Sequence, residues 1–384
     1  MKRGTSAVYA AGFLQGAVFV LIPALGPILR AAPYRLSDAA YGMLYIPEIV
    51  GAIIAALAAG SVREHFGGAW LFRLGVLSNA AAMALLAAAY FVKGETTVVL
   101  LLAETLLLGV GFGVTNASIN RTASFLFAGA ATTAVTLLNA VIGGATAVSP
   151  LILEAIQKVW SWALWPGVLG GLWLLVLLLP KAEDIGKERS GLRAWHVTML
   201  PFAAAVLVYA VAEGSFGSWV NVLVTVDHHL STGTGALALS LFWGGMTIAR
   251  FALGAIPDHL LPRRKVYLMA PLGMGACFLL IPHIDSAAGL IGAFTAAGMS
   301  CGIYYPYSMA YGIASHRDEG TQMAGLLVGA LMVGEGIGSF GLGPLQKIVS
   351  LGTIYSWSSV WALPLLWLAW RNSRPASCKP CPRG

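Results

Sequence analysis

Four acidic residues lie inside long apolar segments of the chain, where charged groups are rare: Glu48, Glu104, Glu213 and Glu335. A carboxyl group that is alternately exposed to water and shielded from it can take up and release a proton, so all four are candidates for proton coupling. Glu213 is the first candidate, because Tyr209 lies one helical turn before it. Hydrogen bonding between helices is the alternative role for each acid.

Arg250 is the basic residue that accompanies these acids inside an apolar segment. It shares a helical face with Trp243, and an ion pair with an acid such as Glu335 is expected, since a lone charge in this environment is costly. Such a pair would act in gating or in packing. Binding of an anionic substrate is the alternative role.

Tyrosines recur at helical spacing in the segment 286–311, and amide side chains occur in several other apolar segments. A sugar needs flat apolar faces beside hydroxyl or amide partners, and these side chains offer both. A packed aromatic core and amide bridges between helices are the alternatives. The candidate substrate-binding residues are Gln15, Asn116, Asn120, Asn139, Tyr209, Asn221, Trp243, Tyr304, Tyr307 and Tyr311.

Enzymatic, metal and nucleotide chemistry find no support in the sequence. Cys277 and Cys301 lie in apolar segments, and the pair Cys378 and Cys381 lacks the second pair that a zinc site needs. There is no phosphate-binding loop of the type Gly-x-x-x-x-Gly-Lys-Ser/Thr, and no convergent nucleophile, base and acid. We therefore expect no cofactor, no metal, no enzymatic activity and no nucleic-acid partner.

Twelve apolar segments must position the candidate residues. Hydrophobic residues make up 58% of the chain and charged residues 10%, whereas about a quarter of a soluble domain is charged. Each segment is long enough to cross roughly 30 Å of hydrocarbon, and only a helix satisfies its own backbone there. The expected spans are 6–30, 40–62, 69–91, 97–119, 130–155, 160–180, 196–222, 235–257, 265–283, 286–311, 322–346 and 351–371.

Lys and Arg residues gather at the ends of these spans on the side of the N-terminus, which predicts that both termini are cytoplasmic. The net charge of +7 is thereby explained as a topology signal and as contact with anionic lipid. The longest polar stretch divides the chain. The expected parts are a six-helix bundle at 1–180, a linker at 181–195, a second six-helix bundle at 196–371 and a cytoplasmic tail at 372–384.

A short loop is repeated at matching places in the two halves. The first copy runs from Gly60 to Glu64 and the second from Gly254 to Asp258, each four residues from the glycine to the acid. A tight turn with an acid and nearby cations can hold helix ends together in one conformation of a rocking transporter. The candidate gating residues are Glu64, Arg250, Asp258, Arg263 and Arg264.

These loops resemble the signature Gly-x-x-x-Asp-Arg/Lys-x-Gly-x-Arg/Lys of the major facilitator superfamily, with Glu64 and His65 as departures in the first copy. Together with twelve spans in two sets of six, the resemblance covers the whole chain. It implies an all-α integral membrane fold with two six-helix bundles around a central cavity. The first, fourth, seventh and tenth spans would line the cavity, and the third, sixth, ninth and twelfth would face lipid.

A narrower resemblance covers the seventh and eighth spans. The pattern of Tyr209, Glu213, Trp243 and Arg250 with its flanking glycines is similar to that of the fucose permease group of proton-linked sugar symporters. The acid that this group carries in its fourth span aligns with Asn116, which cannot titrate. Coupling by that acid is therefore not expected, and another acid would have to replace it.

The expected function is secondary active transport of a small polar, sugar-like solute by alternating access, with protons as the co-substrate in symport. Export of drugs or metabolites by proton exchange is the alternative, and a receptor or scaffold that no longer transports is a third possibility. The expected setting is a bacterial inner membrane, which a multi-pass monomer spans in contact with the lipid bilayer.

Overall fold

The computed structural model describes residues 4–126, 131–179, 196–255, 262–316 and 320–373, and every regular element in these ranges is a helix. In the first half of the chain the helices are α1 (Thr5–Phe19), α2 (Leu21–Arg30), α3 (Asp38–Met43), α4 (Tyr45–Phe66), α5 (Gly68–Ala89), α6 (Glu95–Leu126), α7 (Ala131–Val159) and α8 (Leu164–Val176). The expected all-α fold is therefore confirmed.

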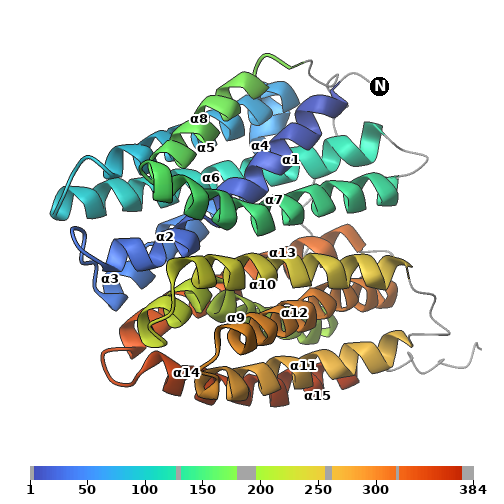
Figure 1. Ribbon diagram of the computed structural model, residues 1–384. Helices are drawn as coiled ribbons and strands as arrows, with labels where there is room; N and C mark the ends of the chain where they lie inside the picture. The colour runs from blue at the N-terminus through green and yellow to red at the C-terminus, as the bar shows by residue number, and fades with distance from the viewer. Residues whose placement is uncertain (1–3, 127–130, 180–195, 256–261, 317–319, 374–384) are drawn as a thin grey trace, which may run out of the picture.

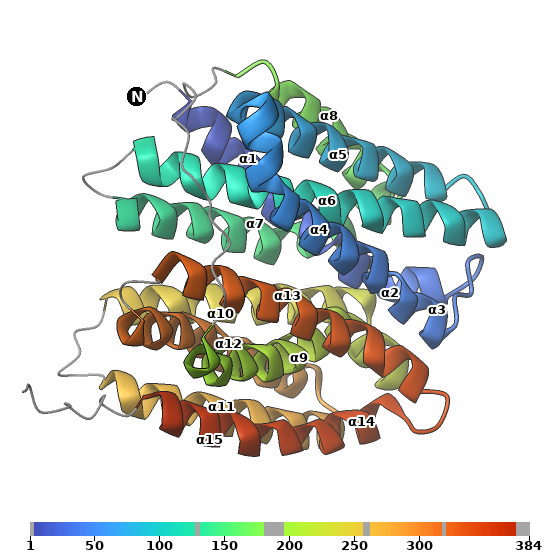
Figure 2. The same cartoon turned by 180° about the vertical axis from the view of Figure 1, so that it is seen from behind.

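The second half begins with a short turn of helix before its first long helix. Its elements are η2 (Val197–Met199), α9 (Leu200–Val222), η3 (Leu223–Asp227), α10 (Thr232–Ala255), α11 (Arg263–Leu280), η4 (Ile281–His283), α12 (Ala287–Ser315), α13 (Gly320–Leu345), α14 (Leu351–Ser358), η6 (Ser359–Trp361) and α15 (Ala362–Asn372). Helices α1–α8 and α9–α15 form two groups that lie side by side (Figures 1 and 2). We call them the N-terminal and C-terminal groups.

Ten helical segments in the described residues are long and apolar enough to cross a membrane. Two of the twelve expected spans do not reach that length as single helices. The sixth corresponds to α8, which has 13 residues, and the twelfth is divided among α14, η6 and α15. A run of apolar residues predicts that a segment can span a membrane. Its length alone does not show where the helix within that segment bends or breaks.

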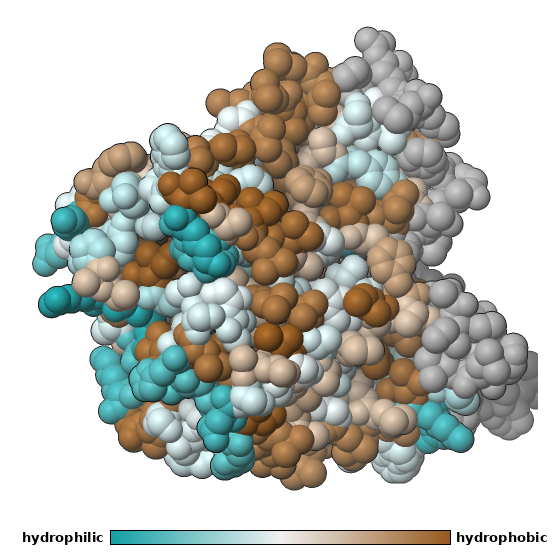
Figure 3. Space-filling model, viewed as in Figure 1, coloured by the Kyte–Doolittle hydropathy of each residue, from teal (hydrophilic) through white to brown (hydrophobic). Residues whose placement is uncertain are grey.

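The outer surface of the two groups is apolar where a bilayer would contact it. Leu175 on α8, Leu272 on α11 and Leu363 on α15 are exposed, at 55%, 55% and 68%. These helices are the sixth, ninth and twelfth expected spans. Figure 3 shows apolar residues over much of the middle of one face, with hydrophilic residues gathered toward its left end.

Helix α1 begins and α15 ends at the same end of the molecule (Figure 1). At the opposite end, which we call the far end, the two groups are joined by specific contacts. The Tyr41 hydroxyl donates to the Ser218 carbonyl at 3.0 Å, and the Asn221 amide donates to the Ala24 carbonyl at 2.7 Å. The Thr232 hydroxyl donates to the Glu154 carboxylate at 2.9 Å. These residues form the far-end seal.

Candidate functional site

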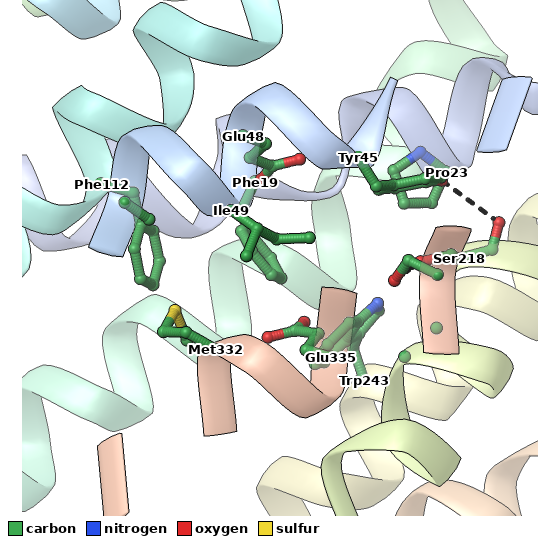
Figure 4. Close-up of a pocket in the computed structure, with 14 residues that line it drawn as sticks. Phe19, Pro23, Tyr45, Glu48, Ile49, Phe112, Ser218, Trp243, Met332 and Glu335 are labelled. Atoms are coloured by element: carbon green, nitrogen blue, oxygen red, sulfur yellow. Dashed lines mark hydrogen bonds between the residues drawn. The ribbon is translucent and has the colours of Figure 1, made fainter. Parts of the chain in front are cut away.

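A cavity lies between the two groups (Figure 4). Both groups contribute to its wall. The lining residues are Phe19, Pro23, Tyr45, Glu48, Ile49, Ala52, Phe112, Gly214, Gly217, Ser218, Trp243, Met332, Glu335 and Ser339. They come from α1, α2, α4 and α6 on one side and from α9, α10 and α13 on the other. A site lined by both groups changes shape when the groups move relative to each other, as alternating access requires.

Two carboxyl groups enter the cavity from opposite groups, Glu48 from α4 and Glu335 from α13 (Figure 4). Both side chains are partly buried, and they interact electrostatically with each other. In the part of the chain that the structure describes, neither carboxyl forms a hydrogen bond or an ion pair. A polar group that is shielded from water and left unpaired costs free energy, so both groups are available to a ligand or a proton.

Helix geometry explains why these two acids reach the cavity. Glu48 lies in the first turn of α4, where the positive end of the helix dipole favours negative charge. Glu335 lies between glycines that allow α13 to approach its neighbours. A Cβ atom at Gly334 would lie 2.2 Å from the Leu207 carbonyl oxygen, and one at Gly336 would lie 2.4 Å from the Ile49 side chain. Larger residues here would push α13 away from the cavity.

Aromatic rings from four helices line the cavity together with the carboxyl groups. The Phe19 ring lies 5.4 Å from the Phe112 ring and 5.8 Å from the Trp243 ring, which it meets edge to face. The buried Trp243 indole nitrogen has no hydrogen-bond acceptor among the described residues. Tyr45 completes the aromatic part of the lining. The cavity therefore combines acidic groups with ring faces that favour positive charge.

Glu213 lies beside the cavity and does not form part of its lining, although the next residue, Gly214, does. Its side chain is 6% exposed, and it interacts electrostatically with Arg250 on α10. Glu335 is within electrostatic range of both residues. The structure thus brings together two of the predicted coupling acids and the predicted base, with Glu335 between the Glu213–Arg250 pair and the cavity.

Glu104 is fully buried within the N-terminal group, and neither of its carboxyl oxygens has a hydrogen-bond partner among the described residues. Glu48 is its electrostatic neighbour. An acid with no partner in an apolar interior is stable only in its neutral form. The four predicted acids therefore form a series, with Glu104 behind Glu48 in one group and Glu213 behind Glu335 in the other.

The predicted amide ligands lie outside the cavity lining. Gln15 accepts a hydrogen bond from Asn79 at 3.1 Å, and Asn79 also donates to Thr115 at 3.2 Å, so this network lies within the N-terminal group. Asn120 donates to Asn116 at 2.6 Å, one turn away on α6. Asn139 on α7 is exposed, and Asn221 belongs to the far-end seal. Of the predicted substrate-binding residues, Trp243 is the one that lines the cavity.

The predicted tyrosine row on α12 packs against α9, α11 and α15. Tyr304 donates to the Leu365 carbonyl at 2.9 Å and stacks on Tyr209 at 5.4 Å. Tyr307 and Tyr311 lie 6.1 and 5.5 Å from the Tyr267 ring. None of the residues that line the described cavity comes from α12, although the resemblance to the superfamily implies that the tenth span is a lining helix.

Three of the predicted gating residues lie near the end of the molecule opposite the far-end seal, whereas Arg250 lies beside the cavity with Glu213 and Glu335. Glu64 is on the last turns of α4, Arg263 and Arg264 begin α11 and are exposed, and Asp258 lies outside the described residues. Sequence reasoning missed the seal at the other end, and it missed Phe19, Tyr45, Phe112 and Asn79. No signal distinguishes these residues from ordinary helix-packing positions in the sequence.

Comparison with known proteins identifies the family. A family model described as the Major Facilitator Superfamily matches residues 8–344, and no curated protein matches. The structure is similar to the inward-open xylose transporter XylE from E. coli, with 13% sequence identity, coverage of 98% of this chain and 97% of that chain, and a TM-score of 0.74.

Two other solved structures share the fold. The nucleoside transporter NupG is 12% identical with a TM-score of 0.75, and coverage is 96% of this chain and 100% of that one. The E. coli fucose:proton symporter FucP is 16% identical with a TM-score of 0.64, and coverage is 97% and 98%. Because the family model covers most of the sequence, the chain belongs to the Major Facilitator Superfamily, whose members are membrane transporters and not enzymes.

Proposed function

We propose that this protein is a secondary active transporter that carries a small polar solute by alternating access and couples its movement to protons. The observation that supports this most is the cavity between the two groups, into which each group extends one unpaired carboxyl group. A proton or a solute bound there is contacted by both groups. Binding can therefore change the relative stability of the conformations in which the groups close at one end or the other.

Proton coupling needs a group whose protonation differs between the two conformations. Glu213 retains the role of first candidate from the sequence, because it is buried beside the cavity and faces Arg250. Opening the far-end seal would change the access of water to this pair and to Glu335. A carboxyl group whose hydration changes in this way also changes its affinity for a proton, and each turnover can then move one.

The first candidate substrate is a sugar-like solute carried in symport with protons. The sequence resemblance to the fucose permease group supports it, and two structural neighbours are named as a xylose transporter and a fucose:proton symporter. Exchange of a drug or metabolite for protons is the second candidate. The composition of the cavity favours it, because the lining includes two acids and none of the predicted amides.

The number and orientation of the membrane spans are part of the same proposal. We infer twelve spans, with the sixth and twelfth completed by the residues that flank α8 and by the broken helix α14–α15. Cytoplasmic termini in a bacterial inner membrane follow from the distribution of Lys and Arg. The two six-helix bundles at 1–180 and 196–371 would move relative to each other in a monomer, with the linker at 181–195 between them.

Purified protein in proteoliposomes tests this function. A pH-sensitive dye trapped inside would report proton movement when a solute is added outside, over a panel of sugars, polyols, carboxylates and organic cations. The proposal predicts that at least one solute moves protons. Inward movement with an added solute indicates symport and outward movement indicates exchange. Solute transport that leaves the internal pH unchanged at every pH tested would contradict proton coupling.

A further inference from the structure

The lining of the cavity carries acid on both walls and no basic side chain. Glu48 and Glu335 come from opposite groups, and none of the lining residues is Lys, Arg or His. The acid Glu104 lies behind Glu48, and Glu213 lies behind Glu335. Arg250 is the base that interacts with Glu213 and Glu335, so it can balance one negative charge.

This imbalance has to be removed whenever the cavity is closed to water. Two carboxylates in a site of low dielectric repel each other and lose hydration, and one guanidinium group cannot neutralise both them and Glu213. The remaining charge can be removed by protons or by a cation bound between the carboxylates. Both solutions use the same oxygen atoms, so a proton and a cation compete for them.

The aromatic rings match the apolar part of such a cation. Phe19 lies against both Phe112 and Trp243, and all three line the cavity together with Met332. Ring faces attract an ammonium group and the carbon atoms attached to it, and the attraction increases where water is excluded. A thioether side chain adapts to ligands of different shape. An amphipathic ammonium ion would therefore satisfy the rings and the carboxylates together.

A neutral sugar would find fewer partners here. The Tyr45 hydroxyl is bonded to that of Tyr41 at 2.7 Å, and the Ser218 hydroxyl donates to that of Ser339 at 2.7 Å. Among the described residues, the Trp243 indole N–H and the two carboxyl groups remain as the unpaired polar groups of the lining. A sugar carries several hydroxyl groups, and each one left unpaired in the cavity would cost binding free energy.

We propose that the cavity binds an organic cation, a protonated amine or a quaternary ammonium ion with an apolar body, between the carboxylates of Glu48 and Glu335. Protons compete with it for these groups, so that the cation enters as protons leave and the transporter works as an exchanger. This inference rests on the proposed function and selects its second candidate. The titratable and charged groups that face the pair are Tyr41, Tyr45 and Glu104 around Glu48, and Glu213 and Arg250 around Glu335.

The test is a titration of the purified full-length protein in detergent with tetraphenylphosphonium and with a tetraalkylammonium ion, followed by calorimetry from pH 5 to pH 8. Binding should tighten as the pH rises, because more of the carboxyl groups are ionised. Glu48→Gln and Glu335→Gln should each weaken binding about tenfold or more and flatten the pH dependence, as expected for the loss of a charged partner. Glu95→Gln is the matched control, since Glu95 is exposed at the start of α6.

Three results would overturn the inference. One is cation binding that does not depend on pH in the unmodified protein, a test that needs no variant to fold. Another is cation binding that is equally tight in both cavity variants and in the Glu95→Gln control. Binding of xylose or fucose without binding of either cation would also reject it, but would leave proton-coupled transport of a neutral solute intact. Failure of the proposed function is distinguishable, since it would appear as solute transport without proton movement in proteoliposomes.

Discussion

The far end of the molecule and its central cavity use polar groups in opposite ways. At the far-end seal, Tyr41, Asn221 and Thr232 each donate a hydrogen bond to the other group of helices. In the cavity, Glu48 and Glu335 face each other from the two groups with no hydrogen bond or ion pair in the described part of the chain.

Under the proposed function, this difference would separate residues that hold a conformation from residues that respond to a ligand. Polar groups that satisfy each other across an interface stabilise one arrangement of the two groups. Groups that are left unpaired destabilise that arrangement until a proton or a solute binds. Under the proposed function, the seal would determine which end is closed, and the cavity would determine what must bind before the closed end changes.

The largest effect is expected at the contact between α9 and α13, the helix that bears Glu335. A Cβ atom at Gly338 would lie 2.1 Å from the Val211 carbonyl oxygen, so Gly338→Ala forces two backbones apart and should destabilise the protein by about 2–3 kcal/mol. Gly341→Ala is the matched control on the same helix, because nothing lies within 4 Å of its added Cβ. Thermal unfolding in detergent measures both. Equal melting temperatures would contradict the close approach of these helices.

The next largest effect is expected on the coupling of solute transport to protons. Glu213→Gln keeps the shape of the side chain but cannot release a proton, so it should abolish gradient-driven accumulation of solute while solute exchange across the membrane at equal concentrations persists. Glu104→Gln is expected to reduce accumulation less, because Glu104 does not line the cavity. Uptake assays in proteoliposomes with and without an imposed pH gradient measure this. Accumulation that survives Glu213→Gln would exclude this residue and make Glu335 the next candidate.

A smaller effect is expected at the far-end seal. Tyr41→Phe removes the hydroxyl that reaches Ser218, at a cost of about 1 kcal/mol, which corresponds to a shift of roughly fivefold in the balance between closed and open forms. Tyr34→Phe is the control, since the Tyr34 hydroxyl bonds the Tyr90 carbonyl within the N-terminal group. Spin labels at Thr96 and Ser231 would report the distance between the groups. An unchanged distance distribution in Tyr41→Phe would remove this contact from the seal.

The smallest effect is expected from probes of topology. Cysteines placed at Ser231 and Ser190, in a background without native cysteines, should leave transport unchanged and be labelled from opposite sides of the membrane. Ser231 lies at the far end, before α10, and is expected to react from outside. Ser190 lies in the expected linker and is expected to react from inside. Reaction of both from the same side would contradict the twelve-span topology.

The helices could be predicted from the sequence because apolar length and the need for internal backbone hydrogen bonds determine them directly. The breaks were not predicted. The first span is interrupted at Val20, between α1 and α2, and the twelfth is divided at Ser359–Trp361. A proline follows each break, Pro23 and Pro364, and is a local signal that the helix can be interrupted there, but how each interrupted helix packs against its neighbours cannot be read from the sequence.

For the candidate site, Glu48, Glu213 and Glu335 could be selected from the sequence, because a charged side chain inside a membrane span costs free energy and is therefore rare. Which of them meet in one cavity was not predictable, because that depends on how α4 and α13 lie against each other. The amide side chains show the same point, that contacts between helices cannot be read from a single sequence. Gln15 carries the polar group that a ligand site needs, but Asn79 on α5 satisfies it, and a single sequence gives no indication that these two side chains meet.

Proton release on ligand binding tests the central claim, that solute and proton share the cavity carboxyl groups, most directly. Tetraphenylphosphonium would be added to purified protein in weakly buffered solution containing a pH-sensitive dye, and the protons released per bound cation would be counted. We predict release from the unmodified protein and much smaller release from the double variant Glu48→Gln/Glu335→Gln. Cation binding without any proton release from the unmodified protein would contradict the claim.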